Sequence, residues 1–201
     1  MKDMNFRLVT RVHEEEPKAS LEGYTLHQAE AVRDFHKSFP MYAPTPLALL
    51  PETAKELGVG EIYVKNESYR FGLNAFKVLG GSYAIGNYLA KRLGKSLSET
   101  GYDVLTAPET RKELGDITFI TATDGNHGRG VAWSARVLGQ KAVVLMPRGT
   151  VKARFDNIAR EGAKVTIEEA NYDECVRRAC ALAGQTERGI VVQDTAWPGY
   201  E

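Results

Sequence analysis

The second half of the chain alternates regularly between two kinds of segment. Short runs rich in β-branched and apolar residues have the composition of buried strands, and longer segments with helical spacing separate them. In chain order we expect a strand at 117–122, a helix at 128–138, a strand at 142–146, a helix at 150–161, a strand at 164–167, a helix at 172–183 capped by Asn171, and a strand at 189–192. Strands joined by helices of this length require right-handed crossovers and therefore a parallel sheet. The predicted fold class is α/β, with parallel sheets flanked by helices.

The first half is predicted to be less regular. Leu26, Ala29, Val32 and Phe35 share one face of an expected helix at 25–37. The prolines of Pro44-Thr45-Pro46-Leu47 require an extended segment. After it we expect a short helix at 47–57 ended by Gly58, a strand at 61–65, a helix from Ala75 to about Leu93, and a polar excursion at 94–116 with one short helix at 109–114.

Composition excludes several function classes. The 26 basic residues balance the 26 acidic residues, so the chain has no general attraction to nucleic acids or anionic membranes. The only two cysteines, Cys175 and Cys180, lie five positions apart on an expected helix and therefore point to different faces, and so few cysteines fit a reducing compartment. The first residues lack a signal peptide's apolar core, and no stretch reaches the roughly 18 apolar residues of a membrane span. We therefore expect a cytoplasmic location.

Lys77 is unusual because of its place in the expected structure. Asn74-Ala75-Phe76-Lys77 puts a lysine in the first turn of a helix, where the positive end of the helix dipole disfavours a cation. That field and an apolar neighbour favour a neutral amine, which Schiff-base formation needs. On this motif alone, a solvated surface lysine is the more common interpretation.

A glycine-rich loop follows the strand expected at 117–122. Thr123-Asp124-Gly125-Asn126-His127-Gly128-Arg129-Gly130 opens the next helix, where backbone N–H groups suit an anion such as a carboxylate. The spacing is neither that of the dinucleotide fingerprint nor that of the Walker phosphate loop. The alternative is a strand-to-helix turn capped by Thr123 or Asp124.

Together these motifs resemble those of the fold type II pyridoxal-phosphate (PLP) enzymes, the tryptophan synthase β family. The resemblance covers Tyr42 to about Val192. The resemblance rests on the segment 44–47, the Phe76-Lys77 pair, the loop 123–127, Met146-Pro147 followed by Lys152, and the segment 162–165. Asn-Ala-Phe-Lys at 74–77, the loop at 123–130 and Asp-Thr-Ala-Trp-Pro-Gly-Tyr at 194–200 are most similar to diaminopropionate ammonia-lyases.

The resemblance implies a PLP-dependent α,β-elimination that converts 2,3-diaminopropionate to pyruvate and ammonia. Lys77 would carry the cofactor as a Schiff base. Lys77 would take the α-proton from one face of the substrate and Asp124 from the other, which would let both D- and L-substrates react. Asp194 would bind or protonate the departing amine. The other implied contacts are Phe76 and Asn126 with the cofactor, and Thr123, Gly125, Asn126 and His127 with the substrate. Purely structural roles for His127 and Asp194 are the alternative.

The same resemblance implies that a second half is missing. Family members hold the PLP phosphate in a later glycine-rich loop, and Gly80-Gly81 lies inside a predicted helix and fits that role poorly. We expect a truncated N-terminal half, with a short natural chain as the alternative, because 191–201 runs from a strand into a loop. Residues 86–190 would form a small mobile domain, and 1–85 and 191–201 would be parts of a large one. The complete enzyme is expected to be a homodimer.

Two other functions stay open. A serine/threonine dehydratase-like lyase would share the cofactor, but Asp124 replaces the small neutral residue usual in those enzymes. A non-catalytic fragment would lack the phosphate loop and would form no Schiff base at Lys77. A dinucleotide-binding domain is disfavoured by the glycine spacing, and no metal site is predicted.

Overall fold

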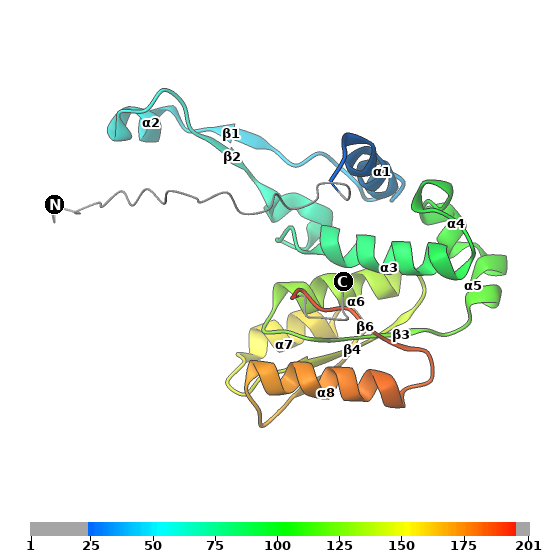
Figure 1. The fold of residues 1–201 in the computed structure, drawn as a ribbon. Coiled ribbons are helices and arrows are strands. Elements are labelled where there is room, and N and C mark those ends of the chain that lie inside the picture. Colours follow the sequence, from blue (N-terminus) through cyan, green and yellow to red (C-terminus); the bar gives the residue numbers. More distant parts are fainter. Residues whose placement is uncertain (1–23, 196–201) are drawn as a thin grey trace, which may run out of the picture.

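The computed structural model describes residues 24–195 and is built on a four-stranded parallel sheet (Figure 1). Its strands, in the spatial order β5-β4-β3-β6, are β5 (Lys164–Ile167), β4 (Lys141–Met146), β3 (Thr118–Ala122) and β6 (Gly189–Val191). All three pairings are parallel, and Phe119 of β3 lies opposite Ala142 of β4 and Ile190 of β6. This confirms the predicted α/β fold with a parallel sheet.

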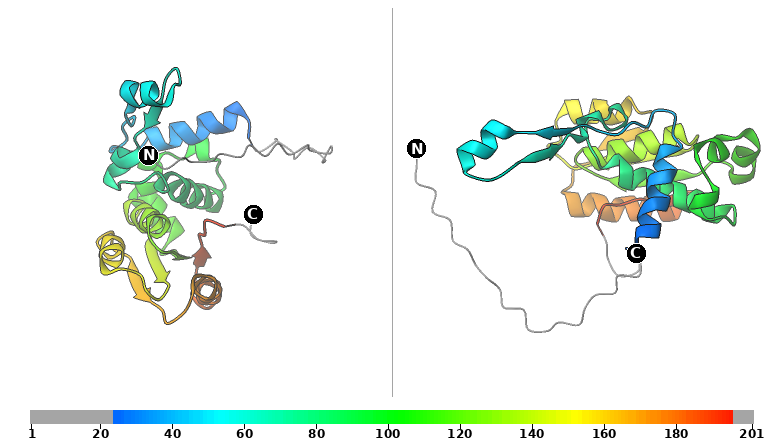
Figure 2. Two further views of the ribbon diagram at one scale, coloured as in Figure 1. Left: turned by 90° about the vertical axis from the view of Figure 1, so that its left-hand side faces the viewer. Right: turned by 90° about the horizontal axis from the view of Figure 1, so that it is seen from above.

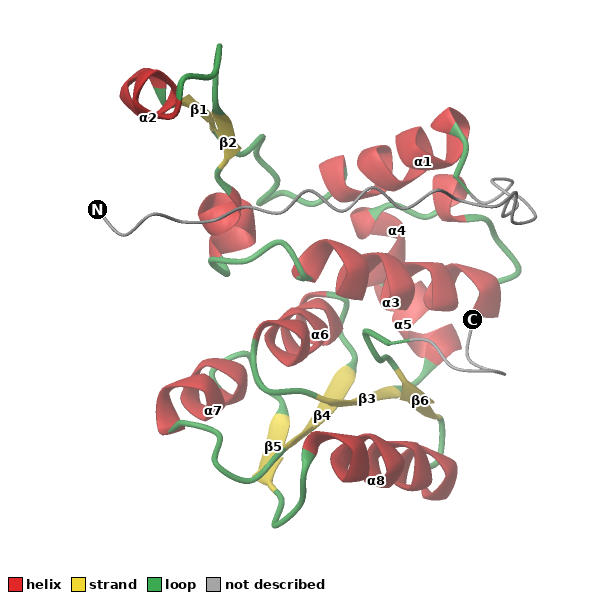
Figure 3. Cartoon of the chain, turned by 60° about the vertical axis from the view of Figure 1, so that its left-hand side comes forward, coloured by secondary structure: helices red, strands yellow, loops and turns green. Residues whose placement is uncertain are grey.

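Helices cover both faces of this sheet (Figures 1 and 3). On one face lie α6 (Asn126–Val137) and α7 (Lys152–Ala159), and on the other lies α8 (Tyr172–Gln185). Successive side chains of β3 point to opposite faces of the sheet, so this strand contributes to two apolar clusters. Phe119 packs in the larger cluster, and Ile120 packs beneath α8. As predicted, Asn171 caps α8 and accepts a hydrogen bond from the backbone N–H of Glu174 (2.9 Å).

A further helix, α3 (Val78–Arg92), packs on the side of α6 away from the sheet (Figure 2). The two helices approach closely where both carry glycine. A Cβ built on Gly130 of α6 would lie 2.9 Å from the Cα of Val78, and one on Gly81 of α3 would lie 3.3 Å from the carbonyl carbon of Gly130. This close approach sets the start of α3, and with it Lys77, beside α6.

The helix α1 (Leu26–Lys37) begins with the reciprocal Thr25–Gln28 capping box. Its predicted apolar face is buried only at the C-terminal end, where Phe35 packs over Gly86. Leu26 is 76% exposed, which corrects the expectation that it faces a core. The reason is that only the end of α1 reaches α3 and the turn at Leu97–Glu99.

An arm formed by β1 (Leu47–Leu49), α2 (Pro51–Leu57) and β2 (Tyr63–Lys65) projects from the body (Figures 1 and 2). The strands β1 and β2 pair in the antiparallel direction. The helix predicted at 47–57 is therefore wrong over its first four residues, of which three form β1. A residue before proline disfavours the helical region, and Leu50 is non-helical (φ −114°, ψ 75°), so α2 begins at Pro51. Gly58 ends α2 in the left-handed conformation (φ 65°), as expected.

The polar excursion contains more structure than the single predicted helix. Besides α5 (Pro108–Leu114), it forms α4 (Tyr102–Thr106) and a 3₁₀ turn at Leu97–Glu99. Reciprocal Ser96–Glu99 hydrogen bonds start the turn, and Ser38 accepts the backbone N–H of Tyr102 (2.8 Å). A second 3₁₀ segment, Glu67–Gly72, precedes the Lys77 motif.

Two other expectations concern cysteines and membranes. Cys175 is buried beneath the sheet and Cys180 is partly exposed, and these two thiols are not paired. Within residues 24–195, no helix combines the length and apolar character that crossing a bilayer requires. The N-terminal residues 1–23 and the Trp197-Pro198-Gly199-Tyr200 part of the last motif lie outside the described residues.

Candidate active site

Lys77 lies at the junction between an irregular turn and α3. The structure places it at the N-cap position (φ −59°, ψ −20°), one residue before the first turn in which it was predicted. The turn depends on Asn74, whose left-handed conformation (φ 60°) asparagine tolerates better than most residues. The Lys77 side chain is 44% exposed, and its Nζ donates a hydrogen bond to Asp194 Oδ2 (2.6 Å).

Asp194 lies in the loop after β6, three residues beyond Val191, at the carboxyl edge of the sheet. Ligands of open α/β sheets bind outside this edge. Loops following β3, β4 and β6 meet there around a polar cleft of about 710 Å³. The cleft is lined by Lys77, Thr123, Asp124, Pro147, Arg148, Asn171, Tyr172, Asp194 and Thr195. The predicted catalytic residues Lys77, Asp124 and Asp194 therefore share one cleft, although they are up to 117 positions apart in the chain.

The Asp194 carboxylate is held by several donors. Oδ1 accepts hydrogen bonds from the Tyr172 hydroxyl (3.1 Å) and Gln193 Nε2 (3.3 Å). Burial by itself raises the pKa of Asp194, but the hydrogen bond from Lys77, the neighbouring His127 and the Tyr172 hydroxyl together outweigh it and leave the pKa below its usual value. Asp194 is thus a stable anion beside the Lys77 amine.

Asp124 is placed at the mouth of the cleft. Its side chain is 74% exposed and pairs with Arg154 Nη1 (3.3 Å). Burial is the largest cause that raises the pKa of the nearby Tyr172 phenol, and the negative charges of Asp194 and Asp124 add to it. The cleft therefore carries two carboxylates: Asp194, paired with Lys77 and with a side chain 25% exposed, and Asp124, which is largely open to solvent.

The Thr123 side chain binds backbone N–H groups of its own glycine-rich loop. The side chain is buried, and its Oγ1 accepts the backbone N–H groups of Gly125 (3.0 Å) and Gly128 (3.3 Å). These two amides, which could otherwise face an anion, are satisfied internally. Gly125 and Asn126 line a different small cavity of about 20 Å³ beside Arg129 and Arg154, so the structure does not bring Asn126 into the cleft of Lys77.

His127 is a packed ring at the start of α6. It is buried, and its Nε2 donates to the Val192 carbonyl (2.8 Å). Burial lowers the pKa of His127, against the opposing effects of that carbonyl and of Asp194. The ring is therefore neutral at ordinary pH, and this geometry agrees with the structural alternative for His127.

Two buried histidines should make stability depend on pH. Burial also lowers the pKa of His36, although the Leu79 carbonyl opposes it. Below about pH 6.5 both histidine rings become protonated in the unfolded chain but stay neutral in the folded chain. The free energy of unfolding should therefore fall as the pH decreases from about 7 to 5. The loss should be at most about 1.4 kcal/mol per pH unit for each ring. Urea denaturation across this range measures the slope. The double variant His36→Gln/His127→Gln should flatten it, whereas His27→Gln, at an exposed position, should not. An equal slope in all three proteins would contradict this assignment.

A second cavity adjoins Lys77 on its other side. It measures about 320 Å³ and is lined by Phe76, Lys77, Leu79, Gly80, Gly81, Ala84, His127, Val192, Gln193 and Asp194. This cavity is more apolar than the cleft, and the Lys77 amine lies between the two. The pair of cavities fits an aromatic aldehyde such as PLP at its ring and its reactive carbon. Among residues 24–195, no glycine-rich loop beside these cavities is built to hold a phosphate group.

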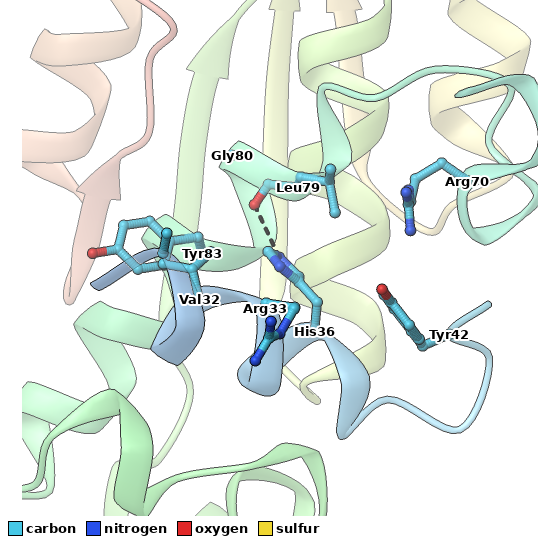
Figure 4. A pocket seen from close by; sticks show the side chains of 9 residues that line it. Val32, Arg33, His36, Tyr42, Arg70, Leu79, Gly80 and Tyr83 are labelled. Carbon is cyan, nitrogen blue, oxygen red and sulfur yellow. Dashed lines mark hydrogen bonds between the residues drawn. The ribbon is translucent and has the colours of Figure 1, made fainter. Parts of the chain in front are cut away.

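A third cavity, between α1 and α3, measures about 360 Å³ (Figure 4). Two of its polar side chains, His36 and Arg70, are already paired within the protein. His36 Nε2 bonds to Ser82 Oγ (2.9 Å) and Leu79 O (3.2 Å), and Arg70 pairs with Glu67 (2.8 Å). This cavity therefore presents packing groups rather than reactive ones, and the chemistry is concentrated at Lys77.

Sequence reasoning missed three residues near Lys77. Tyr172 and Arg148 line the cleft, and Gln193 bonds both Tyr172 and Asp194. Arg148 follows β4 and Tyr172 starts the helix after β5, so both lie at the carboxyl edge of the sheet. The rule that ligands bind at this edge was the available signal.

Comparison with known proteins identifies relatives of this chain. The family model described as "Pyridoxal-phosphate dependent enzyme" matches residues 39–200. A diaminopropionate ammonia-lyase of Salmonella typhimurium is 53% identical over 167 residues, which are 83% of this chain and 41% of that protein. Crystal structures of Escherichia coli diaminopropionate ammonia-lyase match at 44% identity: the apo form has a TM-score of 0.84 and covers 92% of this chain and 49% of that one. The complex with D-serine has a TM-score of 0.83 and covers 90% and 45%.

The chain spans less than half the length of each of these relatives. The family match nevertheless includes most of the chain, the lysine and both cavities beside it. The chain therefore belongs to the pyridoxal-phosphate dependent enzyme family.

Proposed function

We propose that this chain supplies the reactive lysine and half of the active site of a PLP-dependent lyase that converts 2,3-diaminopropionate to pyruvate and ammonia. The observation that carries the proposal is the contact of Lys77 Nζ with Asp194 Oδ2 (2.6 Å) in a cleft that also contains Asp124. Two carboxylates beside one amine suit a substrate with two ammonium groups. The similar ammonia-lyases of Salmonella typhimurium and Escherichia coli support the same substrate.

Each residue has a distinct proposed task. Lys77 and Phe76 would hold the cofactor at its aldehyde carbon and its ring, with Asn126 as a further proposed contact. When bound, PLP supplies an electron sink for the negative charge that develops at the substrate Cα. Lys77 Nζ would take the single Cα proton of one substrate enantiomer, and Asp124, on the opposite face, would take that of the other enantiomer. The amides from Thr123 to His127 would orient the substrate carboxylate, other than that of Thr123, which bonds to the Leu145 carbonyl, and that of Gly125, which bonds to Thr123 Oγ1.

Asp194 would act on the leaving group. Its anionic state beside Lys77 suits binding of the β-ammonium of the substrate, which leaves as ammonia. Water then replaces the α-amino group, so each pyruvate is accompanied by two ammonia molecules. A serine dehydratase would release one. The second carboxylate, Asp124, is the feature that favours the diamine over serine or threonine.

We propose a cytoplasmic homodimer for the complete enzyme, with residues 86–190 as a small mobile domain and 1–85 and 191–201 as parts of a large one. The proposed boundary at 85/86 falls inside α3. The absence of a phosphate loop from the described residues favours the competing proposal of a non-catalytic fragment.

Borohydride reduction of the chain with added PLP should give one dominant adduct. We expect the modified peptide to carry Lys77, because its amine opens into both cavities while its neighbours position it. Mass mapping measures the site, and Lys77→Arg should remove the adduct because a guanidinium does not form a stable Schiff base. Lys152, whose side chain is 85% exposed, serves as the internal reference for nonspecific reaction.

The outcomes separate the competing functions. Labelling spread over Lys152 and other surface lysines would contradict a built site and support the fragment. Where Lys77 is labelled, the ratio of ammonia to pyruvate formed from diaminopropionate by the complete enzyme tests the reaction. A ratio of about two is expected from the chemistry above, whereas turnover of serine or threonine alone would favour the dehydratase alternative.

A further inference from the structure

The Gln193 amide is buried between β3 and α8 in one determined orientation. Its Oε1 accepts the backbone N–H of Ala122 (3.1 Å) and the Thr121 hydroxyl (3.0 Å), and its Nε2 donates to the Ala122 carbonyl (2.9 Å). A backbone N–H can only donate and a carbonyl can only accept. The two groups of Ala122 therefore determine which end of the Gln193 amide is oxygen and which is nitrogen.

This orientation in turn determines where the Tyr172 proton points. Gln193 Nε2 donates to the Tyr172 hydroxyl oxygen (2.7 Å), so that oxygen is the acceptor in this contact. The hydroxyl proton is then directed to its other partner, Asp194 Oδ1 (3.1 Å). Asp194 Oδ2 faces Lys77. A continuous series of hydrogen bonds therefore runs from the β3 backbone to the Lys77 amine.

We propose that Tyr172 and Gln193 are positioning residues, which hold the Asp194 carboxylate with one oxygen directed at Lys77. Tyr172 stands at the first turn of α8, after the capping residue, and is half-buried. Neither side chain has to react. Their task is to hold the Asp194 carboxylate in a fixed position relative to the sheet and to Lys77. Only the catalytic consequence of that position rests on the proposed function.

The surroundings of Asp194 support this assignment. The titratable groups that act on it come from three helices: Lys77 precedes α3, His127 belongs to α6, and Tyr172 belongs to α8. Asp124 and Arg148 line the same cleft from the loops after β3 and β4. Of the groups that contact the carboxylate, Tyr172 and Gln193 hold Oδ1 and Lys77 holds Oδ2. Among residues 24–195, loss of the Tyr172 hydroxyl would leave Oδ1 with only the longer contact from Gln193 Nε2 (3.3 Å), which also donates to the Ala122 carbonyl.

The reactivity of the Lys77 amine reports on this arrangement without any cofactor. Competitive acetylation with acetic anhydride near pH 8, mapped by mass spectrometry, gives the rate at Lys77 relative to the exposed Lys152. Asp194→Asn should raise the relative rate about tenfold, because the amine loses the 2.6 Å contact with the carboxylate anion that occupies it. Tyr172→Phe should raise it about threefold, because it loosens that anion. The double variant should equal Asp194→Asn alone, since Tyr172 acts through Asp194.

The control variant changes a tyrosine outside the cleft. Tyr83→Phe removes a hydroxyl on α3 that does not line the cleft, and should leave the rate unchanged. A wild-type rate in Tyr172→Phe, or an increase that persists on top of Asp194→Asn, would overturn the proposal. Thermal melting verifies that each variant is folded.

A carboxyl NMR titration is the second measurement. Tyr172→Phe should raise the pKa of Asp194, because a donor to the charged form has been removed, and an unchanged titration would also overturn the proposal. Both measurements use the chain without cofactor. Failure of PLP trapping would therefore count against the proposed function alone, and failure of these two would count against the positioning role alone.

Discussion

Replacement of Gly130 by valine is expected to lower the free energy of unfolding by about 3 kcal/mol, at the upper end of typical overpacking costs. Even a Cβ at this position would lie 2.9 Å from the Cα and 3.1 Å from the backbone N of Val78. Because the obstructing atoms are backbone, no side-chain rotation relieves the contact, and α3 must move away from α6. Urea denaturation measures the loss. The same displacement would carry Lys77 away from Asp194, so PLP trapping at Lys77 should also decrease.

The matched control is Gly80→Ala on the facing helix. A Cβ at Gly80 meets no atom within 4 Å. Alanine there should stabilise the protein by about 0.5–1 kcal/mol, the ordinary gain over glycine within a helix. If Gly130→Val proved as harmless as Gly80→Ala, the two helices would have to be farther apart than described.

Phe39→Ala should cost about 3–5 kcal/mol, the usual range for removing a buried phenylalanine. Phe39 is fully buried at the centre of an aromatic cluster. Its ring centroid lies 5.2 Å from Phe35, 5.8 Å from Phe71, 5.2 Å from Tyr102 and 5.9 Å from Trp133. These rings belong to four separate segments, so truncation leaves a cavity that no single segment can fill. Thermal and urea denaturation measure the effect.

Phe76→Ala provides the comparison for this prediction. It removes the same atoms from a side chain that is 61% exposed, and its effect on stability should stay within about 0.5 kcal/mol. Similar losses in both variants would mean that the aromatic cluster does not stabilise the fold. Because Phe76 lines the apolar cavity beside Lys77, its replacement should instead be detected in PLP trapping.

The β/α part of the fold was predictable because its signals are local. Each strand between 117 and 192 is a short apolar run, and each helix has helical spacing over at least two turns. The arm was harder to predict. Residues 47–49 become a strand because they pair with residues 63–65, and the chain between them gives no local sign of that partner. The proline at 51 indicated where the helix could start, but the prediction continued the helix back across it.

The candidate site also contains residues that the sequence predicts and residues whose roles depend on the fold. Lys77, Asp124 and Asp194 belong to motifs that are read directly from the chain. The parts played by Tyr172 and Gln193 depend on β6 lying beside β3, with Val191 opposite Ile120. That register brings the Gln193 amide to the backbone of Ala122 and the Asp194 carboxylate to Lys77. No local pattern encodes a contact between residues more than 70 positions apart.

The projecting arm gives the described chain two levels of stability. Its strands are three residues long, both of their faces are exposed, and the only buried residue of α2 is Ala54. An element with so few buried contacts opens at a lower free energy than the sheet that carries Asp194. We therefore expect the arm to open separately from the body, in which case a single melting temperature would describe only the body.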